Sequence, residues 1–331
     1  VSNEKISINK SKYFCKNIDM KSIPEGLNHH HEVNLIACKN FFAKTLGTYQ
    51  IKLNNIKIAS NIFTYLFYVF RTFKKENTKY LIVSITPHSF LAYILLFFFN
   101  KKVYVYLRSN GYEEYKAIFG HLGSIIYHVM YYVVTFNSKI ITCQKRLVKN
   151  KKYDLVLPSE LDKTWFKKVR KPKLDKPRLL YVGRIKVEKG IFSLINILDE
   201  FKENFKFSIV GSEKKKKINK NFFYYPVCNR SKSLIKFYDK NNIFILPSFT
   251  EAHPKVIDES LARVRPVIIF NDIKHIVKNR KGIFISKRNI DSLNKTIKYI
   301  LNNYSKIQRS IKKNKLPTKE KYIKKISSIF I

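Results

Sequence analysis

The chain has 331 residues, a length typical of two domains. It carries 65 Lys and Arg against 23 Asp and Glu, a formal net charge of +42, and 45% of its residues are hydrophobic, which excludes wholesale disorder. The four cysteines show no metal-ligand spacing, and the N-terminus shows no signal-peptide pattern, so the sequence favours the cytoplasm. The most apolar run, 90–99, is about half the length that spans a bilayer.

The high charge leaves three interpretations open. The basic residues are spread over both halves and are mostly Lys, whereas a DNA reader gathers its charge on one face and relies on Arg. A generally solvated basic surface is therefore favoured first, an anionic membrane partner second and nucleic acid third.

The first half of the chain alternates short apolar runs with longer helical stretches, which predicts parallel strands joined by crossover helices. The predicted strands are 12–18, 48–53, 80–85, 103–107, 139–142 and 155–157. The predicted helices are 30–46, 58–73, 91–99 and 125–136, with 24–28 as a turn before the first of them.

A charged stretch with two prolines, 169–178, predicts a linker between a first domain, 1–168, and a second domain, 179–305. The second domain repeats the alternating pattern, and 306–331 is expected to be helical and to pack back on the first domain. The predicted strands of the second domain are 179–182, 207–210, 243–246 and 267–270. The predicted helices of this domain are 191–201, 253–263 and 290–301, and the helix predicted after it is 318–330. Two such halves predict a cleft lined by the carboxyl ends of their strands.

A glycine-bounded basic loop, 183–190, follows the first strand of the second domain. Gly183 permits a sharp turn at the strand end, and Gly190 opens the next helix. Arg184 and Lys189 are five residues apart in this loop, so both cations can reach one diphosphate. An ordinary basic loop in a Lys-rich protein is the alternative.

A second cluster lies in 248–259. Pro254 suits the first turn of a helix, whose free N–H groups can receive a phosphate. Glu251 precedes this helix and Glu259 lies nearly two turns into it. Carboxylates accept hydrogen bonds from the vicinal hydroxyls of sugars, although acids at a helix start are also favoured by the helix dipole alone.

Taken in order, Gly-Arg…Lys-Gly at 183–190, Ile-Val-Gly at 209–211 and Leu-Pro-Ser…Glu-x7-Glu…Arg-Pro-Val-Ile at 246–268 resemble the GT-B nucleotide-sugar glycosyltransferases of family 4. The resemblance implies an α/β fold of two Rossmann-like, doubly wound parallel-sheet domains facing a central cleft. It also implies retaining transfer from a nucleoside-diphosphate sugar to a glycan or lipid-linked glycan in cell-envelope polysaccharide biosynthesis, with no cofactor and no bound metal.

The resemblance assigns roles residue by residue. Arg184 and Lys189 would hold the diphosphate and stabilise the leaving group, Glu251 would take the hydroxyls of the donor sugar, and Glu259 those of the ribose. The remaining donor-binding candidates are Gly183, Gly211, His253, Pro254, Lys255 and Val256.

The acceptor side departs from the family pattern. The usual glycine pair is reduced to Gly26. The usual histidine after strand 103–107 is missing, so Arg108 or Asn110 is the candidate for its role. His88 is a further candidate, as a base or as a structural histidine. The small residue usual before Pro-Val is replaced by Arg265.

Two other functions stay open at this stage. One is a DNA-modifying glycosyltransferase that acts on a hydroxylated base, and the other is a non-catalytic nucleotide- or glycan-binding module. The aromatic stretches 62–70 and 125–136 read mainly as core, with an apolar strip at a membrane interface as the alternative. The last reading would place the protein peripherally on the inner membrane face.

Overall fold

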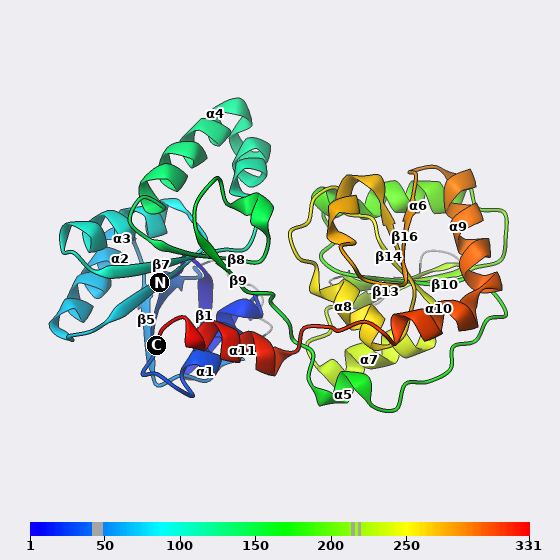
Figure 1. Ribbon diagram of the computed structural model, residues 1–331, viewed down its shortest axis with the longest axis horizontal. Helices are drawn as coiled ribbons and strands as arrows, with labels where there is room; N and C mark the ends of the chain where they lie inside the picture. The colour runs from blue at the N-terminus through cyan, green and yellow to red at the C-terminus, as the bar shows by residue number, and fades with distance from the viewer. Residues whose placement is uncertain (42–48, 213–215, 218–219) are drawn as a thin grey trace. The chain divides into compact units, whose positions relative to one another are not determined.

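The computed structural model describes residues 1–41, 49–212, 216–217 and 220–331 (Figure 1). The chain divides into two compact units. The first comprises Val1–Leu157 with Glu320–Ile331, and the second comprises Pro158–Lys319.

The first unit holds two sheets. The five-stranded sheet has the order β4-β2-β1-β3-β5, in which β2 runs antiparallel to β1 and β4, and the four-stranded sheet β6-β7-β8-β9 is parallel throughout. The strands are β1 (Lys5–Asn9), β2 (Lys12–Cys15), β3 (Asn34–Lys39), β4 (Tyr49–Ile51), β5 (Asn55–Ala59), β6 (Lys79–Val83), β7 (Lys102–Leu107), β8 (Lys139–Thr142) and β9 (Tyr153–Leu155).

Helices cover both faces of the four-stranded sheet. They are α1 (Asp19–Leu27), α2 (Ile62–Arg71) with the 3-10 turn η1 (Thr72–Lys74), α3 (Pro87–Phe98), α4 (Gly111–Val134), the 3-10 turn η2 (Lys145–Leu147) and α11 (Lys319–Ser328). Because side chains alternate along β7, Val105 faces the core formed with α2, α3 and α4, while Tyr104 and Tyr106 face the core formed with α1 and α11. The C-terminal helix thus completes the first unit.

The prediction of a helix over 30–46 is wrong. Residues Asn34–Lys39 form β3, whose apolar centre is buried between β1 and β5, and 42–48 lie outside the described residues. The helix instead precedes this strand: α1 includes Pro24 and Gly26, which the sequence suggested as a turn. A Cβ at Gly26 would overlap the side chain of Ile323 in α11, so this glycine permits close helix packing.

Helix α4 begins well before the predicted 125–136 and consists of two limbs (Figure 1). Non-helical angles at Phe119 (φ −126°, ψ 15°) and Gly120 (φ 62°, ψ −148°) divide it. Tyr112 of the first limb packs edge-on against Tyr127 of the second, with ring centroids 4.8 Å apart, so the chain folds back on itself. Among the described helices, α4 alone is long and apolar enough to cross a membrane by length and composition, but the turn at Gly120 interrupts it.

The second unit is built on one seven-stranded sheet, β12-β13-β11-β10-β14-β15-β16, which is parallel except for β12. The strands are β10 (Arg178–Val182), β11 (Lys206–Ser212), β12 (Lys216–Lys217), β13 (Phe222–Pro226), β14 (Ile243–Leu246), β15 (Val267–Phe270) and β16 (Ile283–Ser286). The helices are α5 (Lys163–Phe166), η3 (Val187–Lys189), α6 (Ile191–Asp199), α7 (Ser231–Lys240), α8 (Lys255–Ala262), η4 (Asn271–Ile276), α9 (Ile290–Asn302) and α10 (Tyr304–Ile311). The central strands are continuous apolar runs because helices cover both faces.

The boundary between the units lies before the predicted linker, 169–178, which belongs to the second unit. Two buried arginines hold the main chain of this segment and of the residues just before it. Arg263 donates to the carbonyl of Trp165 at 2.8 Å, and Arg265 donates to that of Arg170 at 2.7 Å. The unusual Arg265 therefore ties the stretch before β10 to the second unit's core.

Candidate functional site

Two glycines meet at the carboxyl edge of the seven-stranded sheet. Gly183 follows β10 and Gly211 lies near the end of the adjacent parallel strand β11. Gly211 has φ +132°, and a Cβ there would overlap the carbonyl oxygen of Gly183. Only glycine fits this close approach, which lies at the edge where α/β sheets bind ligands.

The structure brings the predicted residues Lys189 and Glu251 together. Lys189 Nζ lies 2.6 Å from Glu251 Oε1, and both side chains are largely buried. Ser248 Oγ donates to the same carboxylate oxygen at 2.7 Å. The two loops are also tied by their backbones, because the Phe249 N–H donates to the Glu188 carbonyl at 3.1 Å. The loops after β10 and β14 therefore form one polar cluster.

Arg184 extends from the same loop but has a different environment. Its residue is exposed, and its carbonyl accepts a hydrogen bond from the Tyr181 hydroxyl at 2.7 Å. The structure thus pairs Lys189 with a carboxylate and leaves the Arg184 residue accessible at the rim of the cluster.

Helix α8 begins at Lys255, with Pro254 as its N-cap, so the predicted start at 253 is two residues early. Lys255 Nζ lies 3.7 Å from Glu160 Oε1, and the Val256 carbonyl accepts from the Tyr238 hydroxyl at 3.3 Å. These contacts fix the first turn of α8 from both sides.

His253, just before α8, is part of a buried charge cluster. Its Nε2 lies 3.1 Å from Asp258 Oδ2, and Arg280 Nη1 lies 2.7 Å from Asp258 Oδ1. Burial opposes ionisation of Asp258, but His253 and Arg280 together outweigh it and hold the pKa of that carboxyl below its ordinary value. His253 therefore helps anchor the loop that carries Glu251.

Glu259 is buried one turn after Lys255, the first residue of α8. Its Oε2 accepts a hydrogen bond from the buried Tyr238 hydroxyl at 2.9 Å. Desolvation raises the pKa of Glu259 to about 7, against the opposing effects of the Tyr238 hydrogen bond and the Lys255 charge. The pKa of the Glu259 carboxyl thus lies near neutral pH.

Two further residues, which the sequence did not indicate, support the loop that carries Glu251. Arg288 donates to the Pro247 carbonyl at 2.6 Å, and its guanidinium carbon lies 4.1 Å from the ring centroid of Phe249. His275 Nε2 lies 2.8 Å from the Glu251 carbonyl oxygen. No motif marks either residue. Their signal is topological, because they follow β16 and β15 at the same sheet edge.

The acceptor-side candidates lie in the first unit. Arg108, after β7, pairs with Asp19 of α1 at 2.7 Å, and Asn110 is the N-cap residue of α4. His88, in the first turn of α3, packs edge-on against Tyr65 at 5.6 Å between ring centroids. Gly26 is a correction: it lies within α1 rather than in a phosphate-binding loop.

The sequence did not point to the acids near Arg108. Asp19 is its direct partner, and burial raises the pKa of Glu4 although the Asn17 N–H and Arg108 act in the opposite direction. Asp19 opens α1, a helix that the sequence did not predict, so its position had no local signal.

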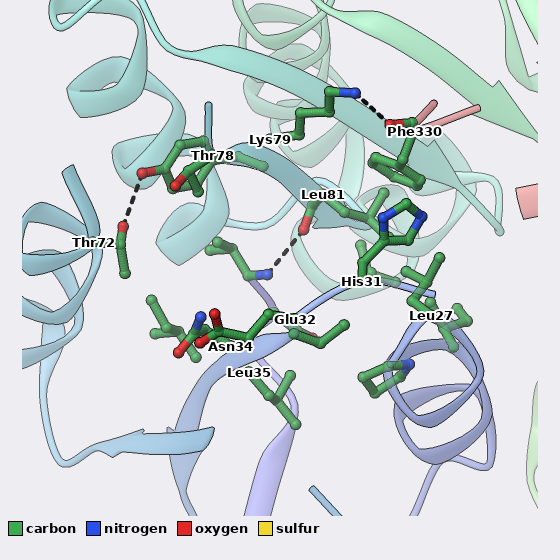
Figure 2. A pocket seen from close by; sticks show the side chains of 18 of the residues that line it. Leu27, His31, Glu32, Asn34, Leu35, Thr72, Thr78, Lys79, Leu81 and Phe330 are labelled. Carbon is green, nitrogen blue, oxygen red and sulfur yellow. Dashed lines mark hydrogen bonds between the residues drawn. The ribbon is translucent and has the colours of Figure 1, made fainter. Parts of the chain in front are cut away.

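A separate cavity of about 410 Å³ lies in the first unit (Figure 2). His31, Leu35, Lys79 and Phe330 are among the residues that line it. None of the four acceptor-side candidates lines it, so the structure distinguishes this cavity from the predicted acceptor residues.

The sequence of this chain is similar to the sequences of glycosyltransferases. Residues 162–316, most of the second unit, match the family model described as glycosyl transferases group 1. Over 217 residues the chain is 25% identical to an uncharacterized glycosyltransferase of Haemophilus influenzae, covering 59% of this chain and 61% of that protein. Over 139 residues it is 30% identical to the capsular polysaccharide biosynthesis glycosyltransferase CapM of Staphylococcus aureus, covering 38% of this chain and 37% of CapM.

The fold is shown by solved structures. The structure of Anabaena HepE in complex with UDP and glucose matches with a TM-score of 0.66 and 12% identity, covering 88% of this chain and 91% of that one. The chain therefore has the GT-B fold, and the expected fold class of α/β with parallel sheets in two domains is confirmed. It spans 61% and 37% of the length of the two curated relatives above.

Proposed function

We propose that this chain is a retaining glycosyltransferase of family 4 that transfers a sugar from a nucleoside-diphosphate sugar. The observation that carries the proposal is the cluster of Lys189, Glu251 and Ser248 at the carboxyl edge of the second unit's sheet, where Gly183 and Gly211 end adjacent strands. The match of this unit to group 1 glycosyltransferases and the UDP and glucose bound by HepE support the same reading.

In this proposal the donor diphosphate lies against the glycine edge and the start of α8. Arg184 and Lys189 supply positive charge to the diphosphate as it leaves, so the transfer proceeds without a bound metal. Glu251 is released from Lys189 to accept hydroxyl hydrogens of the donor sugar, and ionised Glu259 accepts those of the ribose. Ser248, Arg288 and His275 keep Glu251 in position.

We further propose a glycan or lipid-linked glycan as the acceptor, in cell-envelope polysaccharide biosynthesis. The similarity to CapM supports this class of acceptor, and the net charge of +42 supports action against an anionic membrane surface, which we propose is the inner membrane face on the cytoplasmic side. Arg108, Asn110 and His88 are the proposed acceptor-side residues.

A thermal-shift screen of nucleoside-diphosphate sugars tests the donor assignment, because a ligand that binds the folded protein raises its unfolding midpoint, and a tighter ligand raises it further. We expect one or more donors to raise the midpoint of the wild type and the Lys189→Met variant to lose most of that shift. Lys186→Met is the matched control, since Lys186 is an exposed lysine of the same loop. An equal loss in both variants would refute a specific role for Lys189.

A further inference from the structure

The second limb of α4 is apolar on two faces. Its inner face packs in the core of the first unit and consists of Tyr127, Met130, Tyr131 and Val134. Its other apolar positions also recur every three or four residues and are 38% to 73% exposed. This outer face consists of Leu122, Ile125, Ile126, Val129, Tyr132, Val133 and, just beyond the end of the helix, Phe136. A helix with two apolar faces needs an apolar environment on both of them, and the protein supplies one.

A basic segment lies beside this outer face. Residues 145–152 (KRLVKNKK) contain five basic residues and no acid. Lys151 Nζ lies 5.4 Å from the ring centroid of Tyr132 and donates to the Thr135 carbonyl at 2.7 Å, which fixes the segment at the end of α4. The acids of α4, Glu113 and Glu114, lie on the first limb. Cations therefore flank the apolar stripe.

The neighbouring helices extend the same kind of surface. α2, α3 and α4 pack side by side on one face of the four-stranded sheet. An open groove between α2 and the end of α3 has an aromatic lining and basic residues at its edges; its residues are Phe67, Phe70, Arg71, Phe73, Lys74, Phe99 and Lys101. Aromatic rings next to Lys and Arg suit the boundary between acyl chains and headgroups.

We infer that the outer face of α4 docks on an anionic lipid bilayer, with the limb after Gly120 lying in the plane of the interface. This limb, 121–134, is about 21 Å long at 1.5 Å per residue, shorter than the roughly 30 Å hydrocarbon core, and its inner face is committed to the protein core. Segment 145–152 then contacts anionic headgroups while Ile125, Ile126 and Val129 enter the acyl boundary. The inference deepens the proposed function and rests on it for the premise that the acceptor is lipid-linked.

Vesicle sedimentation with the full chain tests this surface. We expect binding to vesicles of phosphatidylcholine mixed with phosphatidylserine, weakened by salt, and little binding to phosphatidylcholine alone. The Ile125→Ser/Ile126→Ser double variant should bind at least ~10-fold more weakly, because two side chains no longer enter the interface. Ile8→Ser is the matched control, since Ile8 is 51% exposed on the five-stranded sheet of the same unit.

The charge contribution is tested separately. Lys145→Gln/Arg146→Gln/Lys152→Gln should weaken binding by about fivefold per charge and reduce its salt dependence. Removing three exposed charges of the second unit, with Lys312→Gln/Lys313→Gln/Lys315→Gln, should have a much smaller effect.

Two results would overturn the inference. One is wild-type vesicle binding by the Ile125→Ser/Ile126→Ser variant. The other is a dimer, seen by size-exclusion chromatography, that this variant loses while vesicle binding stays unchanged, because the outer face would then belong to a second copy. Donor thermal shifts measured without vesicles report on the proposed function alone, so its failure is distinguishable from a failure of docking.

Discussion

The buried carboxyl of Glu259 is expected to make the stability of the second unit depend on pH. Burial raises its pKa from an ordinary 4.5 to about 7. A carboxyl with a raised folded-state pKa stabilises the fold fully below about pH 4.5, and this contribution is lost as the pH rises through 7. For these values, the loss between pH 5 and pH 8 amounts to about 2–3 kcal/mol.

Replacing Glu259 by Gln removes this titration while keeping a hydrogen-bond acceptor for Tyr238. The assay is urea unfolding followed by the fluorescence of Trp165, the chain's one tryptophan, whose ring centroid lies 5.7 Å from that of Tyr238. The free energy of unfolding of the wild type, relative to Glu259→Gln, should fall by about 2–3 kcal/mol from pH 5 to pH 8. Glu200→Gln, at an exposed acid of the same unit, is the control and should show no such change. A wild-type-minus-Gln difference that is equal at both pH values would refute the reasoning.

Three further predictions concern backbone and buried charge. Gly211→Ala should destabilise the second unit by about 2–4 kcal/mol in the same urea assay, because its methyl group overlaps the Gly183 carbonyl at a positive φ; an unchanged midpoint would contradict the close approach. Arg265→Met should cost about 3–5 kcal/mol, since several buried carbonyls lose their donor, and wild-type stability would show that the guanidinium is dispensable. Gly120→Ala should cost about 1–3 kcal/mol through backbone strain alone, as nothing lies within 4 Å of the added carbon, and faster hydrogen exchange across Gly111–Val134 would report it; unaltered exchange would argue against a strained turn.

The sequence predicted the central strands of the second unit because they are buried on both faces. β10, β14 and β15 are continuous apolar runs, each followed by a turn residue. β13 and α7 were not predicted, although β13 is a short aromatic run that ends in proline and α7 carries its apolar residues at helical spacing.

The first unit was harder to predict because distant contacts override local signals. Pro24 and Gly26 disfavour a helix locally, yet α1 forms because α11 packs against it some 300 residues later in the chain. The short run in β3 is buried by its neighbours β1 and β5, and nothing in its own sequence indicates that pairing.

The candidate site shows the same contrast. Lys189 and Glu251 could be identified from their places after strands, and the structure joins them. Arg288 and His275 act on the Glu251 loop from β16 and η4, so only the strand order could reveal them. The pairing of Arg108 with Asp19 likewise needed the position of α1.

Release of nucleoside diphosphate from the donor found by thermal shift tests the central claim most directly. The wild type should release the diphosphate and transfer the sugar, whereas Lys189→Met and Glu251→Gln should each lower turnover by about 10²–10³-fold, because each removes a group that stabilises or positions the reacting donor. Lys186→Met should turn over at close to the wild-type rate. Wild-type turnover in both the Lys189 and Glu251 variants would contradict the assignment of this site.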